Sequence, residues 1–321
     1  MRILVFGAGA IGCHLTARLI KAGADVHLIA RGQQLDAITD RGLRLIGPQE
    51  DFTVPVRAYP STAGLGQFDL VITAVKAYSL PHIVNDLLPV LGAHTQVASA
   101  VNGVPWWYFA GQKGVFGNQP VKRVDPGGGL FHRVGADRAL GCVVLSANEL
   151  VAPGVVQNRS SSNSFVLGPA LEGLAVPAQA SQLAHWLPSV TVSEHIRAAV
   201  WHKLLLNMGS SLLGCLTHST GSQVAQSPAL LGVFEAVMSE GSRVAAAVGV
   251  QVPPDLESRL ARMRSNHHRC SMLQDLEAGR PLELDSQLLA VQDIARAYGV
   301  STTTIDTLVA LLQFKAAAET N

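Results

Sequence analysis

A glycine-rich turn follows the first apolar run of the chain, Ile3 to Phe6. The turn reads Gly7-Ala8-Gly9-Ala10-Ile11-Gly12 and leads into a segment with helical spacing that ends at Lys21. A strand, a glycine turn and a helix in this order predict the phosphate-binding start of a βαβ unit, in which the glycines permit a tight turn, close approach of a pyrophosphate and close packing of helix on strand. The N–H groups and the partial positive charge of the helix N-terminus favour an anion there. We therefore expect Gly7 to Gly12 to bind a dinucleotide.

The end of the next apolar run indicates which dinucleotide binds. Val26 to Ala30 has the composition of a second strand, and Arg31 follows it directly. NAD-binding units usually carry Asp or Glu at this place, where the carboxylate hydrogen-bonds the ribose 2′-hydroxyl, whereas a guanidinium suits a 2′-phosphate. The sequence therefore predicts NADPH as the cofactor. The alternative is that Arg31 is a solvated loop residue.

Apolar runs and helical segments alternate through the first third of the chain. Leu43–Ile46 and Phe52–Val56 are typical of a hairpin appended to the sheet, Asp69–Val75 of a fully buried strand, Leu80–Leu91 of an amphipathic helix and Val97–Val101 of a further strand. Alternating strands and helices predict an α/β fold with a Rossmann-type doubly wound parallel sheet.

Two polar residues come directly after strands of this predicted sheet. Lys76 follows Asp69–Val75, and Asn102 follows Val97–Val101. Ligands of doubly wound sheets bind at the carboxyl ends of the strands. We expect Lys76 and Asn102 to lie at the same crevice as the glycine turn and Arg31, where they would contact the cofactor.

The second part of the chain has a different character. Residues 111–139 form an irregular excursion, and residues 141–146, 155–158 and 164–167 resemble antiparallel strands. Beyond about Glu194 only helical spacing recurs. We expect a NADP-binding Rossmann-type domain at residues 1–194 and an all-helical substrate domain at residues 195–321, with helices at Ile196–Gly209, Ala229–Val248, Pro254–Arg264, Ser271–Glu277, Ser286–Tyr298 and Thr304–Lys315.

Charge and cysteine usage narrow the class of partner. The net charge is +1, so the chain has no broad electropositive footprint for nucleic acid or an anionic membrane. No apolar stretch reaches the ~18 residues of a membrane span. The four cysteines are far apart with no CxxC spacing, which favours reduced thiols over a disulfide framework or a metal site. We expect a soluble cytoplasmic protein with a small-molecule partner, no metal, and apolar helices that leave a homodimer possible.

Further motifs follow the glycine turn in a fixed order. They are Val75-Lys76, Asn102-Gly103, Trp201-His202-Lys203-Leu204-Leu205-Leu206-Asn207, Cys270-Ser271-Met272-Leu273-Gln274-Asp275 and Gly279-Arg280-Pro281-Leu282-Glu283-Leu284-Asp285. With GxGxxG, this set resembles the ketopantoate reductase (2-dehydropantoate 2-reductase) family, whose motifs read GxGxxG, VK, NG, WxKLxxN, SSMLQD and TEID. The resemblance covers nearly the whole chain. It implies that NADPH reduces a 2-oxo acid to a 2-hydroxy acid.

The resemblance also implies roles for single residues. Lys203 matches the catalytic lysine, and an ammonium supplies both the proton and the positive charge that a developing alkoxide needs. Glu283 matches the glutamate that orients the lysine and holds the substrate hydroxyl. Asn207, on the same helix face as Lys203, and Ser271 would bind substrate, while Asn102 and Lys76 would contact the nicotinamide ribose or the substrate. Taken singly, each is more typical of a surface or capping residue, and it is the ordered set of motifs that favours these roles.

The chain departs from the family motifs at several places. Ser211 stands where the family often has a second asparagine, Cys270 replaces the first serine of SSMLQD, and Leu288-Leu289 replaces a frequent Asn-Gly pair. The aromatic run Trp106-Trp107-Tyr108-Phe109 either lines a more apolar substrate pocket or forms the core of the excursion. The leading interpretation is reduction of ketopantoate to pantoate, for pantothenate and coenzyme A synthesis. The alternatives are a paralogous 2-oxo acid reductase with a bulkier substrate and a catalytically idle NADP-binding protein.

Overall fold

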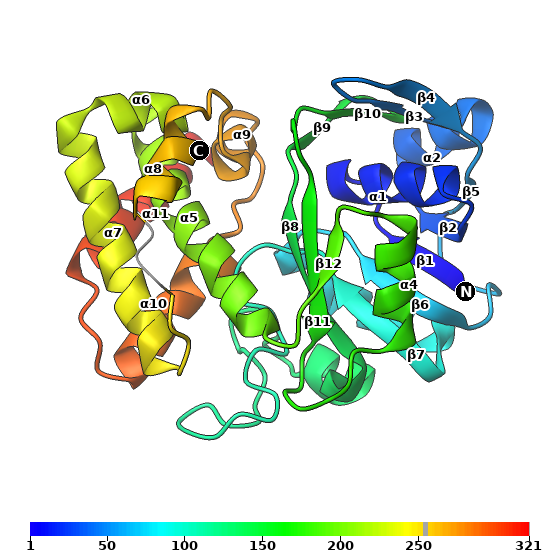
Figure 1. Ribbon diagram of the computed structural model, residues 1–321, viewed down its shortest axis with the longest axis horizontal. Helices are drawn as coiled ribbons and strands as arrows, with labels where there is room; N and C mark the ends of the chain where they lie inside the picture. Colours follow the sequence, from blue (N-terminus) through cyan, green and yellow to red (C-terminus); the bar gives the residue numbers. More distant parts are fainter. Residues whose placement is uncertain (253–255, 321) are drawn as a thin grey trace. The chain divides into compact units, whose positions relative to one another are not determined.

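The structure, a computed structural model, describes residues 1–252 and 256–320. The chain divides into two compact units, Met1–Arg197 and Ala198–Asn321. The first unit carries the sheets and the second consists of helices (Figure 1). The boundary between the units lies in the first turn of the helix Ile196–Thr217, so this helix belongs almost entirely to the second unit.

The large sheet of the first unit is the predicted doubly wound sheet. Within the described residues it contains eight strands, which are β1 (Arg2–Phe6), β2 (Asp25–Ile29), β5 (Arg57–Tyr59), β6 (Phe68–Thr73), β7 (Leu91–Ser99), β8 (Ala139–Leu145), β11 (Ser164–Pro169) and β12 (Val190–Val192). Their order is β12-β11-β8-β7-β6-β1-β2-β5, and all neighbouring pairs are parallel except β8 with β11. The structure confirms the Rossmann-type fold.

A second, four-stranded sheet corrects the expected place of the hairpin. The strands β3 (Leu43–Ile46) and β4 (Asp51–Val54) do pair antiparallel, but they join β9 (Asn148–Ala152) and β10 (Val155–Asn158) in the order β4-β3-β10-β9 rather than the large sheet. Likewise β10 pairs with β9 and β3, while β11 pairs with β8. The helix α1 (Ala10–Lys21) packs against the strands of this small sheet and against β1 and β2 (Figure 1). The small sheet therefore covers one side of α1.

The predicted helix at Leu80–Leu91 is broken into short turns. A 3₁₀ helix at Ala77–Ile83 contains Pro81, α3 covers Val84–Leu87, and a second 3₁₀ helix at Leu88–Val90 contains Pro89. Proline has no backbone N–H to donate and its ring clashes with the preceding turn, so the two prolines prevent a continuous α-helix.

The aromatic run of the excursion is packed inside the first unit. Its four side chains, Trp106, Trp107, Tyr108 and Phe109, are at most 4% exposed. The indole N–H of Trp106 donates to Ser99 Oγ at 3.2 Å, and the buried guanidinium of Arg197 donates to the carbonyl oxygens of Tyr108 and Ala110, each at 2.9 Å. The structure thus supports core packing over a pocket lined by these rings.

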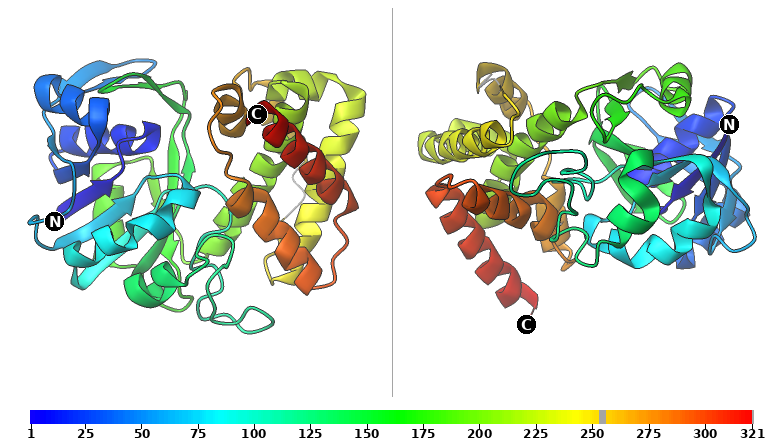
Figure 2. Two further views of the ribbon diagram at one scale, coloured as in Figure 1. Left: turned by 180° about the vertical axis from the view of Figure 1, so that it is seen from behind. Right: turned by 90° about the horizontal axis from the view of Figure 1, so that it is seen from below.

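The second unit confirms the expected helical domain. Its described helices are α5 (Ile196–Thr217), α6 (Gly221–Gln226), α7 (Pro228–Ala247), α8 (Leu256–Arg264), α9 (Ser271–Glu277), α10 (Ala290–Ala297) and α11 (Thr303–Thr320), with a π-helical segment at Asp285–Leu289. The expected start of one helix at Pro254 lies outside the described residues. In Figure 2, α7 runs beside α10 and α11, against which it packs. The first unit adds two peripheral helices, α2 (Gly32–Arg41) and α4 (Ala178–Trp186).

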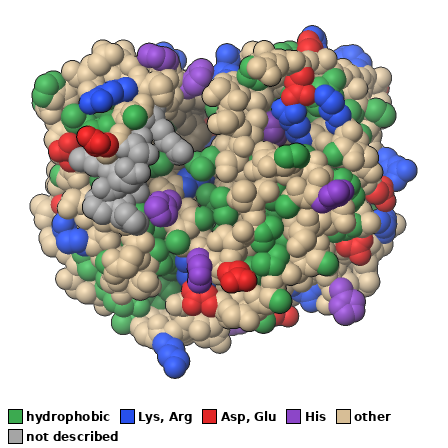
Figure 3. Space-filling model, viewed as in Figure 1, with side chains coloured by type: hydrophobic (Ala, Val, Ile, Leu, Met, Phe, Trp, Pro, Cys, Tyr) green, Lys and Arg blue, Asp and Glu red, His purple; other side chains and the backbone are tan. Residues whose placement is uncertain are grey.

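The surface carries charges of both signs. On the face drawn in Figure 3, Lys and Arg side chains are interspersed with Asp and Glu, and neither sign gathers into a broad patch. Within residues 1–252 and 256–320, no helix combines the length and the apolar character that a bilayer crossing requires.

Candidate functional site

Four neighbouring strands of the large sheet end at one level. Phe6 of β1 lies opposite Ile29 of β2 and Thr73 of β6, and Thr73 lies opposite Ser99 of β7. Because β2 and β6 flank β1 on opposite sides, the chain reverses direction across the sheet here, which is where doubly wound sheets bind ligands. The residues that follow these four ends are Gly7, Arg31, Lys76 and Asn102. The structure therefore brings the predicted cofactor-binding residues to one edge.

Packing of the chain itself requires two glycines of the turn. Gly7 has φ +114°, and a Cβ there would lie 2.8 Å from Val75 Cγ1 and 3.0 Å from the carbonyl oxygen of Ala74. A Cβ on Gly12 would overlap the carbonyl oxygen of Gly7. The two glycines let α1 start directly against the end of β1.

Gly9 has no such internal reason to be glycine. A Cβ there would meet only Ala74 O at 3.6 Å, an ordinary contact, and its φ of −77° suits any residue. Gly9 is the N-cap of α1, and the partly accessible Ala8, Ala10 and Ile11 flank it. The first N–H groups of the helix have no acceptor within the helix. A small, open cap with free donors fits a phosphate, so these residues suit a dinucleotide.

Arg31 stands between β2 and α2. Its backbone is the N-cap of α2, and its side chain is 69% exposed and lies 3.5 Å from a carboxylate oxygen of Asp86. An ion pair this long and this exposed contributes little to stability. The guanidinium is therefore accessible to an anionic ligand at the end of β2.

Lys76 and Asn102 are both half-buried. Lys76 directly precedes the 3₁₀ helix after β6, and its carbonyl oxygen accepts from the N–H of Ser79 at 2.8 Å. Asn102 precedes Gly103, whose φ of +93° allows the chain to turn away from β7. Both side chains belong to the loops that border the glycine turn.

In the second unit, α5 carries Lys203 and Asn207 one turn apart. Both are half-buried, whereas Leu204, Leu205 and Met208 of the same helix are at most 1% exposed. The helix is held at a close approach to α7, because a Cβ on Gly209 would overlap the ring of Phe234. This close packing fixes the rotation of α5 and so the face on which Lys203 and Asn207 lie.

Ser271 begins α9 and is exposed. The residue before it, Cys270, is the N-cap, and its Sγ accepts from the N–H of Leu273 at 3.4 Å. Cys270 also accepts hydrogen bonds from the side chains of Ser211 and Cys215 on α5. Two of the positions where the chain departs from the family motifs, Ser211 and Cys270, thus contact each other. Through this contact the first turn of α9, with Ser271, is tied to α5.

Glu283 is a buried carboxyl at 5% exposure. The side-chain amide of Gln287 donates to its Oε2 at 3.4 Å. The loop that leads to it is closed by an ion pair, in which Arg280 Nε donates to Oδ1 of the buried Asp275 at 2.8 Å. The loop is thereby fixed at both ends.

Sequence reasoning did not single out three residues of this arrangement. Asp275 and Arg280 lie in the quoted motifs, and their opposite charges five positions apart were the available signal. Gln287 lies in the π-helical segment, where no regular helical period places it. The binding and catalytic roles of the sequence-predicted residues stay predictions.

Family profiles match both units. The profile described as "Ketopantoate reductase PanE/ApbA" matches residues 3–112, and the one described as "Ketopantoate reductase PanE/ApbA C terminal" matches residues 195–316. A curated "2-dehydropantoate 2-reductase" of Mesorhizobium japonicum is 37% identical over 98% of this chain and 97% of its own length.

Solved structures agree with these matches. A crystal structure from Ralstonia solanacearum MolK2, provisionally described as a ketopantoate reductase, has a TM-score of 0.90 at 34% identity and covers 99% of this chain and 98% of that chain. A D-mandelate dehydrogenase with NADH and anilino(oxo)acetate shares the fold, with a TM-score of 0.83 at 21% identity over 100% of both chains. The chain belongs to the ketopantoate reductase family and is an NAD(P)-dependent oxidoreductase.

Proposed function

We propose that this protein uses NADPH to reduce a 2-oxo acid to a 2-hydroxy acid, with ketopantoate as the substrate and pantoate as the product, in pantothenate and coenzyme A synthesis. The name of the Mesorhizobium japonicum relative supports the substrate, since that protein is identical at 37% of positions along nearly its whole length. The observation that carries the proposal is the half-buried pair Lys203 and Asn207, which stands on a helix whose rotation is fixed.

The first unit supplies the cofactor-binding part of the proposed site. When bound, NADPH supplies the hydride that the substrate carbonyl carbon accepts. The N–H groups at Gly9 to Gly12 bind the pyrophosphate, and the exposed guanidinium of Arg31 binds the 2′-phosphate. Lys76 and Asn102, which border the same edge, contact the nicotinamide ribose or the substrate.

The second unit supplies the groups that act on the substrate. The Lys203 ammonium stabilises the developing alkoxide and donates a proton to its oxygen. Asn207, one turn further along α5, hydrogen-bonds the substrate. The buried Glu283, held by Gln287, orients the lysine and accepts from the nascent hydroxyl, and Ser271 donates to the substrate carboxylate.

One observation bears on the alternative of a bulkier substrate. This alternative rested on the aromatic run Trp106 to Phe109, and all four rings are buried in the first unit. Their burial favours core packing of these rings over a substrate pocket lined by them.

The test follows NADPH absorbance while the enzyme turns over ketopantoate and a panel of branched and aromatic 2-oxo acids. We expect ketopantoate to give the highest kcat/KM. If an aromatic 2-oxo acid gave a higher kcat/KM than ketopantoate, the alternative of a bulkier substrate would replace the proposal of ketopantoate. Tight NADPH binding with no turnover of any 2-oxo acid would support the idle binding protein and contradict the proposed chemistry.

A further inference from the structure

Two of the four cysteines lie side by side in the second unit although 54 positions separate Cys215 from Cys270 in the sequence. Cys215 is on α5 and fully buried, and Cys270 precedes α9 and is partly exposed. The thiol of Cys215 donates a hydrogen bond to Cys270. The side chain that would separate α5 from Cys270 is missing, because residue 214 is glycine and a Cβ there would lie 3.2 Å from the Cys270 sulfur.

The Cys270 sulfur sits among hydrogen-bond donors. Besides Cys215, the hydroxyl of Ser211 and the backbone N–H of Leu273 donate to it, the latter at 3.4 Å. Donors that point at a sulfur stabilise the thiolate relative to the thiol. The hydrogen bond from Cys215 is the largest cause that lowers the pKa of Cys270 from 9.0 to about 7, against the opposing effect of burial.

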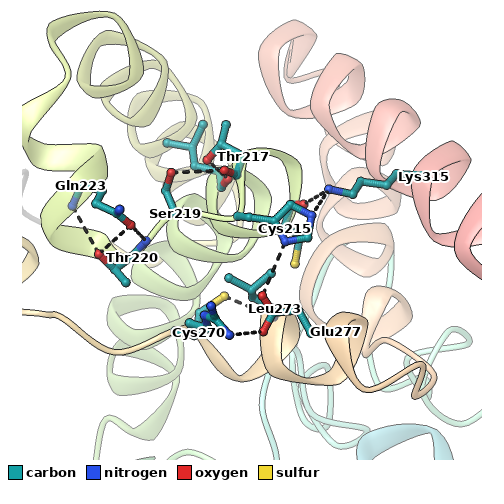
Figure 4. A network of polar contacts seen from close by, with 12 residues as sticks. Cys215, Thr217, Ser219, Thr220, Gln223, Cys270, Leu273, Glu277 and Lys315 are labelled. Carbon is teal, nitrogen blue, oxygen red and sulfur yellow. Dashed lines mark hydrogen bonds and ion pairs between the residues drawn. The ribbon is translucent and has the colours of Figure 1, made fainter.

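Charged groups surround the pair at one end of α5 (Figure 4). Lys315 of α11 donates from Nζ to the carbonyl oxygen of Cys215 at 2.7 Å and lies 2.7 Å from Nε2 of His218. On the other side of the imidazole, Nδ1 lies 3.5 Å from Glu277, which also pairs with Arg269 at 2.8 Å. Two basic side chains, Lys315 and Arg269, thus stand against one carboxylate, Glu277, at this end of the helix.

The other two cysteines are buried residues of the first unit. Cys13 is fully buried and donates its thiol hydrogen to the carbonyl oxygen of Ala8 at 3.3 Å, and burial raises its pKa to about 12. Cys142 is a buried residue in the middle of β8. The chain therefore contains its own reference thiols.

We propose that Cys270 and Cys215 form an oxidisable dithiol, in which Cys270 is the thiolate that reacts with hydrogen peroxide and Cys215 is the thiol that resolves the product into a disulfide. In the first step the Cys270 sulfur attacks one peroxide oxygen, the O–O bond breaks, and the hydroxide that leaves takes a proton to become water; Cys270 becomes a sulfenic acid. In the second step the Cys215 sulfur attacks the Cys270 sulfur, the S–O bond breaks, and the leaving hydroxide takes the Cys215 proton. Two thiols are oxidised by two electrons and one peroxide is reduced to two waters.

Formation of the bond requires the two sulfur atoms to move together. Sulfur atoms in hydrogen-bond contact must approach each other by about 1.5 Å to reach the length of a disulfide. Cys270 follows the non-helical residues 265–269 and no side chain at Gly214 resists its movement toward α5. The approach therefore needs displacement of a loop end, and α5 itself stays in place.

The first experiment treats the purified full chain with a small excess of hydrogen peroxide, blocks remaining thiols with N-ethylmaleimide after denaturation, and measures intact mass and cross-linked peptides. Before blocking, we expect the treated protein to be about 2 Da lighter than the untreated protein, because a disulfide has lost two hydrogens. Two thiols should remain for N-ethylmaleimide to block, and one peptide pair should be joined through Cys215 and Cys270. Dithiothreitol should restore all thiols. Four remaining thiols, or a disulfide that includes Cys13 or Cys142, would overturn the proposal.

Variants separate the two roles. Cys215→Ser should stop at a sulfenic acid on Cys270 that dimedone traps, Cys270→Ser should leave Cys215 unmodified, and the matched control Cys142→Ala should behave as the wild type. Dimedone labelling of Cys215 in the Cys270→Ser variant at the wild-type rate would contradict the assignment of roles.

A second measurement needs no cysteine variant. The rate at which iodoacetamide alkylates Cys270 should rise with pH around a midpoint of about 7, in line with its lowered pKa. Ser211→Ala, which removes one donor, should move this midpoint upward. A midpoint no lower than that of an unfolded-chain cysteine would overturn the proposal. Neither readout involves turnover of a 2-oxo acid, so failure here leaves the proposed reductase activity untouched, and the reverse also holds.

Discussion

The two units prepare their parts of the site in different ways. In the first unit the important features are backbone features: strand ends in register, a glycine with positive φ, and a helix whose N-cap is a glycine without a side-chain cap. In the second unit the proposed catalytic groups are single side chains, and close packing of α5 on α7 fixes the face that carries Lys203 and Asn207. The difference implies that substitutions in the first unit change folding and cofactor affinity, whereas substitutions in the second change the rate of the chemical step.

The largest expected effect tests the second unit. Lys203→Ala should lower kcat by about 10²- to 10⁴-fold, the usual contribution of a general acid, because no other group replaces its proton and charge. NADPH affinity, measured by fluorescence titration, should stay unchanged. Lys113→Ala, at an exposed lysine of the first unit, is the control and should leave both quantities unaltered. A Lys203→Ala enzyme with the wild-type kcat would remove the residue from the mechanism.

The next effect tests the backbone character of the first unit. Gly12→Ala places a methyl group on the carbonyl oxygen of Gly7, and we expect it to lower the free energy of unfolding by about 3 kcal/mol, as overpacking of a rigid contact does. Urea denaturation measures it. The control is Gly232→Ala on α7, where nothing lies within 4 Å of the new Cβ, and the helix should gain stability.

Gly9→Ala tests whether the N-cap of α1 serves ligand binding and not packing. The substitution makes only an ordinary contact within the chain, so the free energy of unfolding should not fall, yet NADPH should bind more weakly because the methyl group points into the open cap. If Gly9→Ala destabilised the chain as Gly12→Ala does, the cap would be a packing feature and not a ligand-binding one.

A pH dependence follows from His14 on α1. The imidazole is 1% exposed and stacks on Phe165 with centroids 6.0 Å apart, and burial first, then the charge of Arg18, lowers its pKa from 6.5 to about 4. Between these values the unfolded chain takes up a proton that the folded chain does not. Stability is therefore complete above about pH 6.5 and falls as pH drops, by about 2 kcal/mol between about pH 7.5 and about pH 5.

Denaturation at several pH values measures this slope. His14→Leu should flatten the slope, whatever its effect on absolute stability, while His94→Gln at an exposed site should preserve it. An unchanged slope in the His14 variant would mean that another group binds the proton.

The smallest expected effect concerns Arg31, the side chain of the first unit that we propose selects NADPH over NADH. Arg31→Glu should lower the preference for NADPH over NADH by about tenfold, about 1.4 kcal/mol, since a carboxylate repels the 2′-phosphate and accepts from a 2′-hydroxyl. Arg41→Glu, at the other end of α2, is the control. Equal ratios of kcat/KM for the two cofactors before and after the change would reject Arg31 as the determinant.

The parts of the fold that follow from local patterns were predictable. Spacing and composition predict the strand, glycine turn and helix at the start of the chain. They also predict the helical second half. Long-range pairing was not predictable in the same way, because the sequence of a strand does not specify its partner, and β10 pairs with β3, which lies more than a hundred positions earlier in the chain. The prolines at 81 and 89 did carry the signal for the broken helix.

The site shows the same division. Motif residues such as Lys203 and Glu283 could be named from the sequence. The contact of Ser211 and Cys215 with Cys270 could not, because it joins positions more than fifty residues apart on separate helices. The ion pair of Asp275 with Arg280 could have been predicted from the sequence, since two oppositely charged residues five positions apart flank a glycine.

The small sheet has a consequence for the synthesis of the chain. Its parallel pair joins Arg44–Ile46 to residues 155–157, so the β9 and β10 part of the cover of α1 is synthesised on the order of ten seconds after the helix. During that interval the nascent chain lacks the strands that cover one flank of its first helix. A fragment that ends near residue 112 would keep the glycine turn and never receive this cover.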